Sequence, residues 1–504
     1  MAFGILLILS TFAAIALPLC LYLIYRRRLS NSFPLPPGPP RDPIIGHLRH
    51  MPSTNRAAVF HKWSQTYGDV MYLEVLGNPI IVLNTEQVAA ELLNKRSAIY
   101  SDRPRFILYE MIGWSTTLSL MRYGKRFTLH RQLHQSYLSR QNCLDFRDMQ
   151  TQEAHSLVKN LLAAPPSGYS KFINRFSTGV ISQIVAGHRI CTDDDPYMQT
   201  TQALRESLGR AGIPGVTALD LLPFLKYLPE WFPGFKSGAI ARECRPALQR
   251  LYDLPLQAVR AQMESGTAKP SFLQSHLERM KESQEPRNYD DVKWAAAAMF
   301  GSTIWSSVTV FVLAMLLHPE YQAKAQQEID SVVGAEGRLP GFEDRGELPL
   351  VECIMEETLR WHPPTELGVP HALMKDDVYQ GMFIPKGSTV FANIRAMSLD
   401  ERTYSAPNQF FPERFLPEPR GRGEPHFTSV YGFGRRICSG QHLADQSLWI
   451  AIVSILASCT ISTAIDENGC AIVPEDGMSD GVSSHPNDFP CVISPRDHKL
   501  GPAE

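Results

Sequence analysis

A loop rich in glycine and arginine, which leads directly into a long apolar run, constrains this chain more than any other feature. The loop spans residues 431–440 and reads YGFGRRICSG, and the run behind it predicts a helix from about Gln441. Gly432 and Gly434 allow backbone dihedral angles that other residues resist, so the chain can turn back on itself. Gly440 allows a flat ligand to approach the backbone closely. The loop can therefore present one side chain outward.

The side chain presented in this way is the thiol of Cys438. Arg435, Arg436 and the N-terminus of the following helix lower the cost of negative charge on its sulfur. A thiolate is also the form of cysteine that binds metal ions. A lone cysteine in a glycine-rich loop is more often inert packing, so the prediction of a metal-binding thiolate depends on the rest of the chain.

The order aromatic, Gly, x, Gly, x, Arg, x, Cys, x, Gly resembles the haem-binding loop of the cytochrome P450 family. The resemblance implies that Cys438 is the axial thiolate on haem iron and that Arg436 meets a haem propionate. It also assigns Gly432 and Gly440 to the haem-binding loop. Tyr431 stands where the family usually has Phe, and it keeps an aromatic ring over the sulfur. Because a thiolate ligand favours O–O cleavage, the resemblance implies oxygenase chemistry.

Upstream, the segment from Trp294 to Leu317 carries no charge and follows the acidic start Asp290-Asp291, so it predicts one long helix that stops at Pro319. Its 24 residues also satisfy the length of a membrane span. The serine and threonine residues in its middle favour a buried helix of a large core instead. By resemblance, this helix crosses the distal face of the haem.

The same segment departs from the family pattern. Thr303 matches the family threonine and is implied to assist oxygen activation, but Ser302 replaces the usual acid and Phe300 replaces the usual glycine. Serine does not change its charge near neutral pH, so proton delivery must use water, a serine hydroxyl or the substrate. Considered alone, Thr303 would rather bond back to a helix carbonyl.

Two further positions are implied to hold the haem. Residues 123–131 predict a helix on which Phe127 and Arg131 lie one turn apart. The family has Trp and Arg there, facing the propionates, so Arg131 matches while Phe127 lacks the N–H donor. The Pro370-His371 pair resembles the strand that sends a basic residue to the second propionate. Without the resemblance, Arg131 would be a surface charge and His371 a hydrogen-bonded surface imidazole.

The resemblance places the substrate next to these haem contacts. Phe300, Leu367, Gly368 and Val369 are the predicted pocket residues. Further candidate pocket segments are residues 106–120, 208–235 and the turn-rich hairpin 478–484. Their aromatic and aliphatic content favours a terpenoid or polyketide-like substrate, and a steroid or fatty acid fits almost as well.

The segment from Leu350 to Trp361 predicts another helix, on which Glu357 and Arg360 share one face. This pair resembles the ExxR motif of the family, whose partner is the arginine of a later Pro-Glu-Arg-Phe segment, here Arg414. A buried network of these three residues would lock the cysteine loop into register. We expect its role to be structural rather than catalytic, and removal of one member to leave an unpaired buried charge.

At the N-terminus, 23 uncharged and mostly apolar residues, Phe3–Tyr25, are followed at once by three arginines. This pattern predicts a single membrane-spanning helix with the catalytic domain on the cytoplasmic side, which in a eukaryotic cell means the endoplasmic reticulum. A cleaved signal peptide is the rival, but the run is long and lacks a basic n-region. The expected division is an anchor at 1–28, a stiff proline-rich hinge at 29–43 and a catalytic domain at 44–504.

Short strands at 70–75 and 79–83, followed mainly by helices, predict a mainly α fold with small β-sheets (α+β), and the resemblance implies the cytochrome P450 fold. The chain has 504 residues, of which 44% are hydrophobic, enough for a large core. A net charge of −2 without a basic block argues against nucleic acid as a partner. Nine scattered cysteines suit a reducing compartment and no structural zinc.

The motifs together imply a haem-thiolate monooxygenase that inserts one oxygen atom from O₂ into an apolar small molecule. The chain has no glycine-rich nucleotide fingerprint of its own, so electrons are expected from NADPH–cytochrome P450 reductase. Segments 102–104, 229–233 and 318–320 resemble those of fungal microsomal enzymes of secondary metabolism.

Two other functions stay open from the sequence. One is a haem-thiolate isomerase or dehydratase that needs no external electrons, suggested by the missing acid at Ser302. The other is a catalytically impaired ligand-binding scaffold protein of a biosynthetic complex. Turnover without NADPH would favour the first, and ligand binding without product the second.

Overall fold

The computed structural model describes residues 33–212, 214–215, 217–228, 237–283, 288–475 and 477–496. The predicted membrane anchor, the first residues of the predicted hinge and the segment 229–233 lie outside the described residues. The predicted division into anchor, hinge and catalytic domain therefore stays a prediction.

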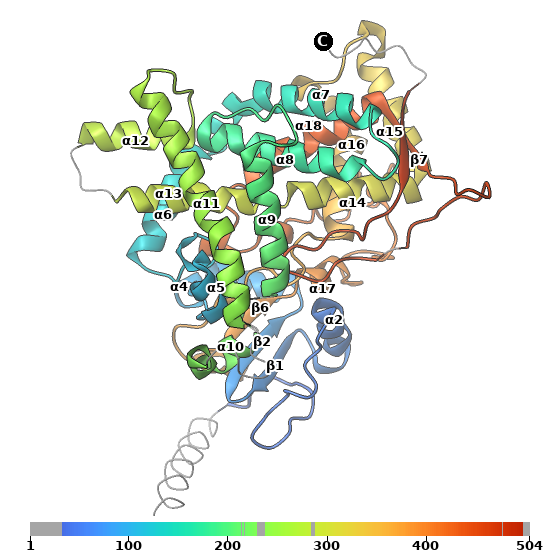
Figure 1. Cartoon of the computed structure of the whole chain (residues 1–504). Coiled ribbons are helices and arrows are strands. Elements are labelled where there is room, and N and C mark those ends of the chain that lie inside the picture. The colour runs from blue at the N-terminus through green and yellow to red at the C-terminus, as the bar shows by residue number, and fades with distance from the viewer. Residues whose placement is uncertain are drawn as a thin grey trace, which may run out of the picture.

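Helices make up most of the described chain, and small sheets lie toward its edges (Figure 1). The α-helices are α2 (Arg56–Tyr67), α3 (Glu86–Ala89), α4 (Ser97–Tyr100), α5 (Ile107–Ile112), α6 (Lys125–Tyr137), α7 (Arg147–Leu162), α8 (Tyr169–Ala186), α9 (Pro196–Ala211), α10 (Ala218–Leu221), α11 (Ser237–Glu264), α12 (Phe272–Ser283), α13 (Tyr289–Ala298), α14 (Ile304–Leu317), α15 (Pro319–Val333), α16 (Pro349–Trp361), α17 (Ile394–Ser398) and α18 (Gln441–Ser458). Short 3₁₀ or π turns connect several of them, including η1 (Ala90–Lys95), η5 (Met299–Gly301), η8 (Pro412–Phe415) and η10 (Gly434–Arg436).

The largest sheet of the described residues has the strand order β1-β2-β6-β3. Its strands are β1 (Val70–Val75), β2 (Asn78–Leu83), β3 (His371–Ala372) and β6 (Thr389–Ala392). β1 and β2 form an antiparallel hairpin, while β6 runs parallel to β2. The described residues also form two antiparallel strand pairs, β4 (Asp377–Tyr379) with β5 (Met382–Ile384) and β7 (Cys459–Thr463) with β8 (Cys491–Pro495). The mainly α architecture with small sheets is confirmed, as are the two predicted strands.

The core is built around α14 and α18, which pack against each other and are covered by α7, α8, α15 and α16 (Figure 1). α14 is apolar on nearly all sides, and residues 448–457 of α18 are buried throughout, which is typical of helices surrounded by protein. The segment Tyr289–Leu317 is long and apolar enough to cross a membrane, but 72% of its most apolar window is buried inside the fold. Its prediction as a core helix is confirmed.

The prediction of one continuous helix from Trp294 to Leu317 is wrong. α13 ends at Ala298, a 3₁₀ turn covers Met299–Gly301, and α14 begins only at Ile304. Ser302 has an extended backbone with ψ of 141°, and its hydroxyl accepts a hydrogen bond from the Ile304 N–H at 3.3 Å. Serine side chains compete with the helix for backbone groups in this way. The distal segment is therefore two helices joined by a break.

Candidate active site

The loop before α18 folds as its glycines require. Gly432 and Gly434 have φ of +77° and +55°, as predicted. A Cβ atom at Gly434 would lie 2.0 Å from the carbonyl oxygen of Leu93, so only glycine fits against η1. The N–H of Cys438 donates to the carbonyl of Tyr431 at 2.8 Å and closes the loop.

The side chain of Cys438 is accessible, yet burial by the surrounding protein raises the pKa of its thiol. Both observations hold if the sulfur lines an interior space rather than the outer surface. The N–H of Gly440 and the charge of Arg131 act in the opposite direction and lower this pKa. A bound metal ion would favour the thiolate against this burial.

The arginines of the loop do not act on the sulfur as predicted. Arg435 is exposed and donates to the hydroxyl of Tyr123. Arg436 donates from Nε to the carbonyl of Ser101 at 2.8 Å, and its guanidinium lies 3.8 Å from the centre of the Phe127 ring. Burial lowers the pKa of Arg436 to about 10. The charged side chain that lowers the pKa of Cys438 is Arg131 instead, which donates a hydrogen bond to the carbonyl of Ile437.

Three basic side chains, those of Arg103, His371 and Arg436, lie at or beside the segment Tyr100–Arg103. The carbonyl of Tyr100 accepts from Nδ1 of His371 at 2.8 Å, beside the Ser101 carbonyl that accepts from Arg436. Arg103 is buried and donates to the carbonyls of Val369 and Pro370 at 2.6 and 2.9 Å. Burial and the charge of Arg436 lower the pKa of Arg103. The structure thus brings Arg436 and His371 together and adds Arg103, which the sequence reasoning missed.

These groups fit a flat cofactor with two carboxylates. Nη2 of Arg436 is buried without a hydrogen-bond partner among the described residues. Neither it nor Arg103 pairs with a carboxylate there, because the nearby Asp102 is bound by Arg122 at 2.5 Å. Cationic groups held in this way suit an anionic ligand.

Two glycines leave space for the flat part of such a cofactor. A Cβ atom at Gly440 or Gly301 would meet no other atom within 4 Å. One glycine precedes α18 and the other lies in the break of the distal helix. The residues present therefore fit haem.

His371 fits less well than Arg436. Since a carbonyl only accepts hydrogen bonds, Nδ1 must carry the hydrogen, and Nε2 of a neutral imidazole is then an acceptor. Burial, followed by the charge of Arg103, lowers the pKa of His371 well below its usual value. His371 would donate to a propionate only as the imidazolium, which an anionic partner favours.

Thr303 lies in the distal break. Thr303 is the residue before α14, and its hydroxyl makes no hydrogen bond with the described residues. Its carbonyl accepts from the N–H of Ser307 at 3.1 Å. Thr303 therefore does not bond back to a helix carbonyl, the alternative expected for an isolated threonine.

The predicted pocket residues come from distant segments and mostly pack together. Phe300, Val369 and Val482 contact one apolar cluster that contains Phe106 and Trp114. The hairpin 478–484 returns to the distal helix, where the hydroxyl of Ser306 donates to the carbonyl of Ser484. Leu367 differs, because it packs on the sheet beside Phe60 and Phe391. A small cavity bordered by Glu366, Leu367, Gly368, Val369, Asp480 and Val482 joins the two regions.

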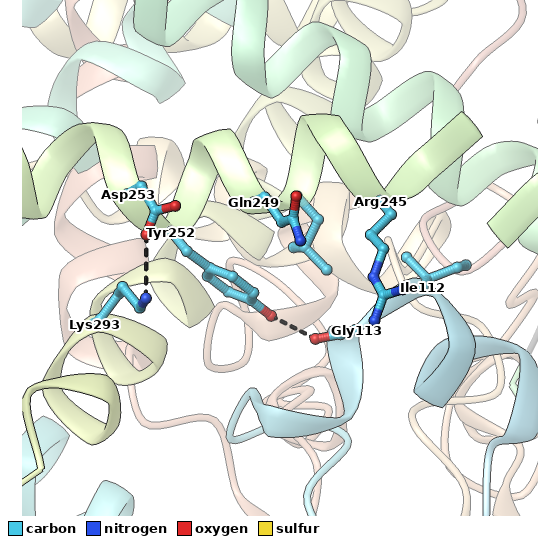
Figure 2. A pocket seen from close by; sticks show the side chains of 8 residues that line it. Ile112, Gly113, Arg245, Gln249, Tyr252, Asp253 and Lys293 are labelled. Atoms are coloured by element: carbon cyan, nitrogen blue, oxygen red, sulfur yellow. Dashed lines mark hydrogen bonds and ion pairs between the residues drawn. The ribbon is translucent and has the colours of Figure 1, made fainter. Parts of the chain in front are cut away.

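A second hollow lies on α11, between α5 and α13 (Figure 2). This groove measures about 230 Å³, and Tyr252 and Lys293 contribute to its wall. Tyr252 donates to the carbonyl of Gly113 at 2.9 Å, and Lys293 pairs with Asp253 at 3.1 Å. None of the residues predicted to bind haem or to activate oxygen lines it.

The structure brings Glu357, Arg360 and Arg414 together without any exposure of their side chains. Glu357 binds Arg360 through two bonds of 2.7 Å and Arg414 through one of 3.1 Å. A fourth member, Glu424, binds Arg414 at 2.6 Å and balances the charge. Glu424 follows no recognised motif, so no sequence signal pointed to it. The network ties α16 to the chain that leads into the cysteine loop.

An accessible cysteine before a central helix, with arginines held nearby, would suit a flat anionic cofactor. The cytochrome P450 family model matches residues 36–488. Cytochrome P450 monooxygenase 208 of Postia placenta is 38% identical over 496 residues, which cover 97% of this chain and 96% of that protein. Cytochrome P450 monooxygenase claR of Ampulloclitocybe clavipes is 36% identical over 470 residues, covering 92% and 86%.

The fold is also found among solved structures. A zebra fish cytochrome P450 solved with abiraterone has a TM-score of 0.71 at 24% identity, covering 87% of this chain and 99% of that one. The chain belongs to the cytochrome P450 family. It is an enzyme, a cytochrome P450 monooxygenase, and the family implies haem held by a cysteine thiolate.

Proposed function

We propose that this monooxygenase inserts one oxygen atom into an apolar, terpenoid or polyketide-like molecule of secondary metabolism. The observation that carries the proposal is that one loop presents the accessible sulfur of Cys438 and also a buried nitrogen of Arg436 without a partner among the described residues. Haem bound there supplies the activation of O₂. The relatives named above are fungal monooxygenases, which supports this reaction class.

Each site residue has a proposed role that follows from its position. Cys438 would hold the iron, while Arg436 and Arg131, with His371 as imidazolium, would bind the propionates. The hydroxyl of Thr303, which makes no hydrogen bond with the described residues, would donate a hydrogen bond that assists oxygen activation. Ser302 offers a hydroxyl to a water that carries protons inward.

The apolar wall supports the substrate class. Phe106 and Trp114 are buried, and Phe300 stacks on Tyr197 with ring centres 6.0 Å apart. Such a wall orients a hydrocarbon skeleton and excludes water from it. Electrons are proposed to come from NADPH–cytochrome P450 reductase, with the enzyme anchored in the endoplasmic reticulum membrane by Phe3–Tyr25.

The test is expression in microsomes with the reductase, feeding of candidate terpenoid and polyketide intermediates, and mass spectrometry for one added oxygen atom. Product that requires NADPH and disappears in Cys438→Ala is expected. Conversion that proceeds equally without NADPH would contradict a monooxygenase reaction and favour an isomerase or dehydratase.

A further inference from the structure

His134 connects the cysteine loop to the distal helix. It lies in α6 and is 2% exposed. Nδ1 lies 2.8 Å from the hydroxyl of Ser439, the residue after Cys438, and Nε2 lies 2.9 Å from the carbonyl oxygen of Ala295 in α13. One imidazole ring thus spans the gap between two parts of the site that are far apart in sequence.

The two partners determine which nitrogen carries the hydrogen. The Ala295 carbonyl only accepts, so Nε2–H donates to it. The ring is neutral because burial lowers the pKa of His134 to about 4. Nδ1 is then an acceptor, and the Ser439 hydroxyl donates to it. The bridge is a directed chain from Ser439 through His134 to Ala295.

The bond to Ala295 is linked to the break in the distal helix. In a continuous helix the N–H of Met299 would donate to the Ala295 carbonyl. Here that N–H points to the carbonyls of Ala296 and Ala297 instead. His134 supplies a donor to a carbonyl that has lost its helical partner, which favours the broken form over the straight one.

Neighbouring residues of α6 hold the same two parts. His130, one turn earlier, contacts Asp291 of α13 at 2.9 Å. Arg131 donates to the carbonyl of Ile437 in the cysteine loop. His134 is the residue of α6 whose side chain contacts both sides in the described hydrogen bonds.

We propose that His134 is a positioning residue, which holds the break at 299–303, and with it Thr303, in register with the Cys438 loop. The inference deepens the proposed monooxygenase function and rests on it. Without the bridge, the separate contacts of His130 with α13 and of Arg131 with the cysteine loop remain, and the register of the two parts is held less firmly. The loop that carries Cys438 then holds the cofactor less firmly, and oxygen activation becomes less coupled to product.

Three substitutions at this position separate the two bonds. His134→Phe keeps a ring and removes both bonds. His134→Asn keeps an acceptor near the place of Nδ1, and His134→Gln keeps a donor near the place of Nε2. His130→Phe is the matched control, because it removes a buried histidine that bonds α6 to α13 but not to the cysteine loop.

The readouts are the lifetime of the red-shifted Soret peak of the reduced carbon-monoxide complex and the product formed per NADPH. We expect His134→Phe to lose the red-shifted peak roughly tenfold faster than His130→Phe, the factor that one buried hydrogen bond typically represents. His134→Asn should keep the longer lifetime but lose coupling, and His134→Gln should do the reverse. Equal lifetimes and equal coupling in His134→Phe and His130→Phe would overturn the role.

Two checks keep the result interpretable. If His134→Phe does not fold, Ser439→Ala removes the loop side of the bridge and should shorten the lifetime in the same way; an unchanged lifetime overturns the role. A wild-type protein without the red-shifted peak would overturn the proposed function itself. A wild-type protein with the peak, together with indistinguishable variants, overturns only the positioning role.

Discussion

Two regions of the molecule treat their polar groups in opposite ways: the buried ion-pair network behind the Cys438 loop, and the break in the distal helix. Behind the loop, Glu357, Arg360 and Arg414 are fully buried and joined by short ion pairs. In the distal break, the hydroxyl of Thr303 makes no hydrogen bond with the described residues, and the backbone leaves the helix at Ser302. The first region is built to be rigid, and the second leaves groups available for a ligand and water.

The comparison teaches where sequence change can be tolerated. A buried ion-pair network fails when one member is removed, because the remaining charge is stranded. An interrupted helix with available hydroxyls can exchange an acid for a serine and still fold. We therefore expect substitutions in the first region to act on stability and those in the second to act on coupling.

The largest effect is expected from Glu357→Ala. It leaves Arg360 and Arg414 without their shared partner and should lower the free energy of unfolding by about 3–5 kcal/mol. Urea unfolding measures the change. Glu356→Ala is the control, since this neighbour pairs with the exposed His426, and it should cost no more than about 1 kcal/mol. Similar costs for both variants would show that the buried network does not hold the fold.

A pH dependence is expected from His134, which belongs to both regions. Burial lowers its pKa in the folded protein from 6.5 to about 4, so between these values the unfolded chain binds more protons. Stability therefore falls as the pH falls through this window, by about 3 kcal/mol for this group. Unfolding of wild type and His134→Phe at pH 7 and pH 4.5 measures the difference. Parallel losses in both proteins would contradict the assignment.

Gly434→Ala tests the fit of the loop against η1. The left-handed φ and the contact with the Leu93 carbonyl should together cost about 2 kcal/mol. Gly440→Ala is the matched control, since its Cβ would meet open space. We expect it to unfold like wild type but to bind less haem, as its methyl group takes up space for the cofactor. Equal free energies of unfolding for the two variants would contradict the steric role of Gly434 against the Leu93 carbonyl.

The smallest effect on stability is expected from Ser302→Asp. This substitution should act instead on the coupling of NADPH consumption to product. An aspartate side chain can accept the hydrogen bond from the Ile304 N–H as the serine does, so the free energy of unfolding should change by less than about 0.5 kcal/mol. The ratio of product to NADPH consumed should rise, because a carboxylate can pass protons inward. Unchanged coupling would show that proton delivery does not pass through this position.

The features that depend on motifs with fixed spacing could be predicted from the sequence. The two ends of α16, the start of α18, the two strands at 70–83 and the grouping of Glu357 with its arginines follow from local pattern and resemblance. The break at Ser302 could not be predicted from the sequence, because the composition there favours a helix. The bonds that compete with the helix come from the Ser302 side chain and from His134 on another element.

In the candidate site, too, the contacts that could not be predicted from the sequence are those between residues far apart in the chain. Arg103 stands in a segment that carried only a family resemblance, and its proximity to Arg436 depends on how residues 100–103 meet the strand at His371. The electrostatic role given to Arg435 failed for the same reason, because its side chain turns to Tyr123. Sequence fixes which charges exist near a motif, whereas packing decides which of them act.

The central claim is a bond between the sulfur of Cys438 and haem iron, and its most direct test is the absorbance of the dithionite-reduced protein under carbon monoxide. The account predicts the red-shifted Soret peak of thiolate ligation in the wild type and its loss in Cys438→Ala. A wild-type spectrum without that peak, or a Cys438→Ala spectrum that keeps it, would contradict the account.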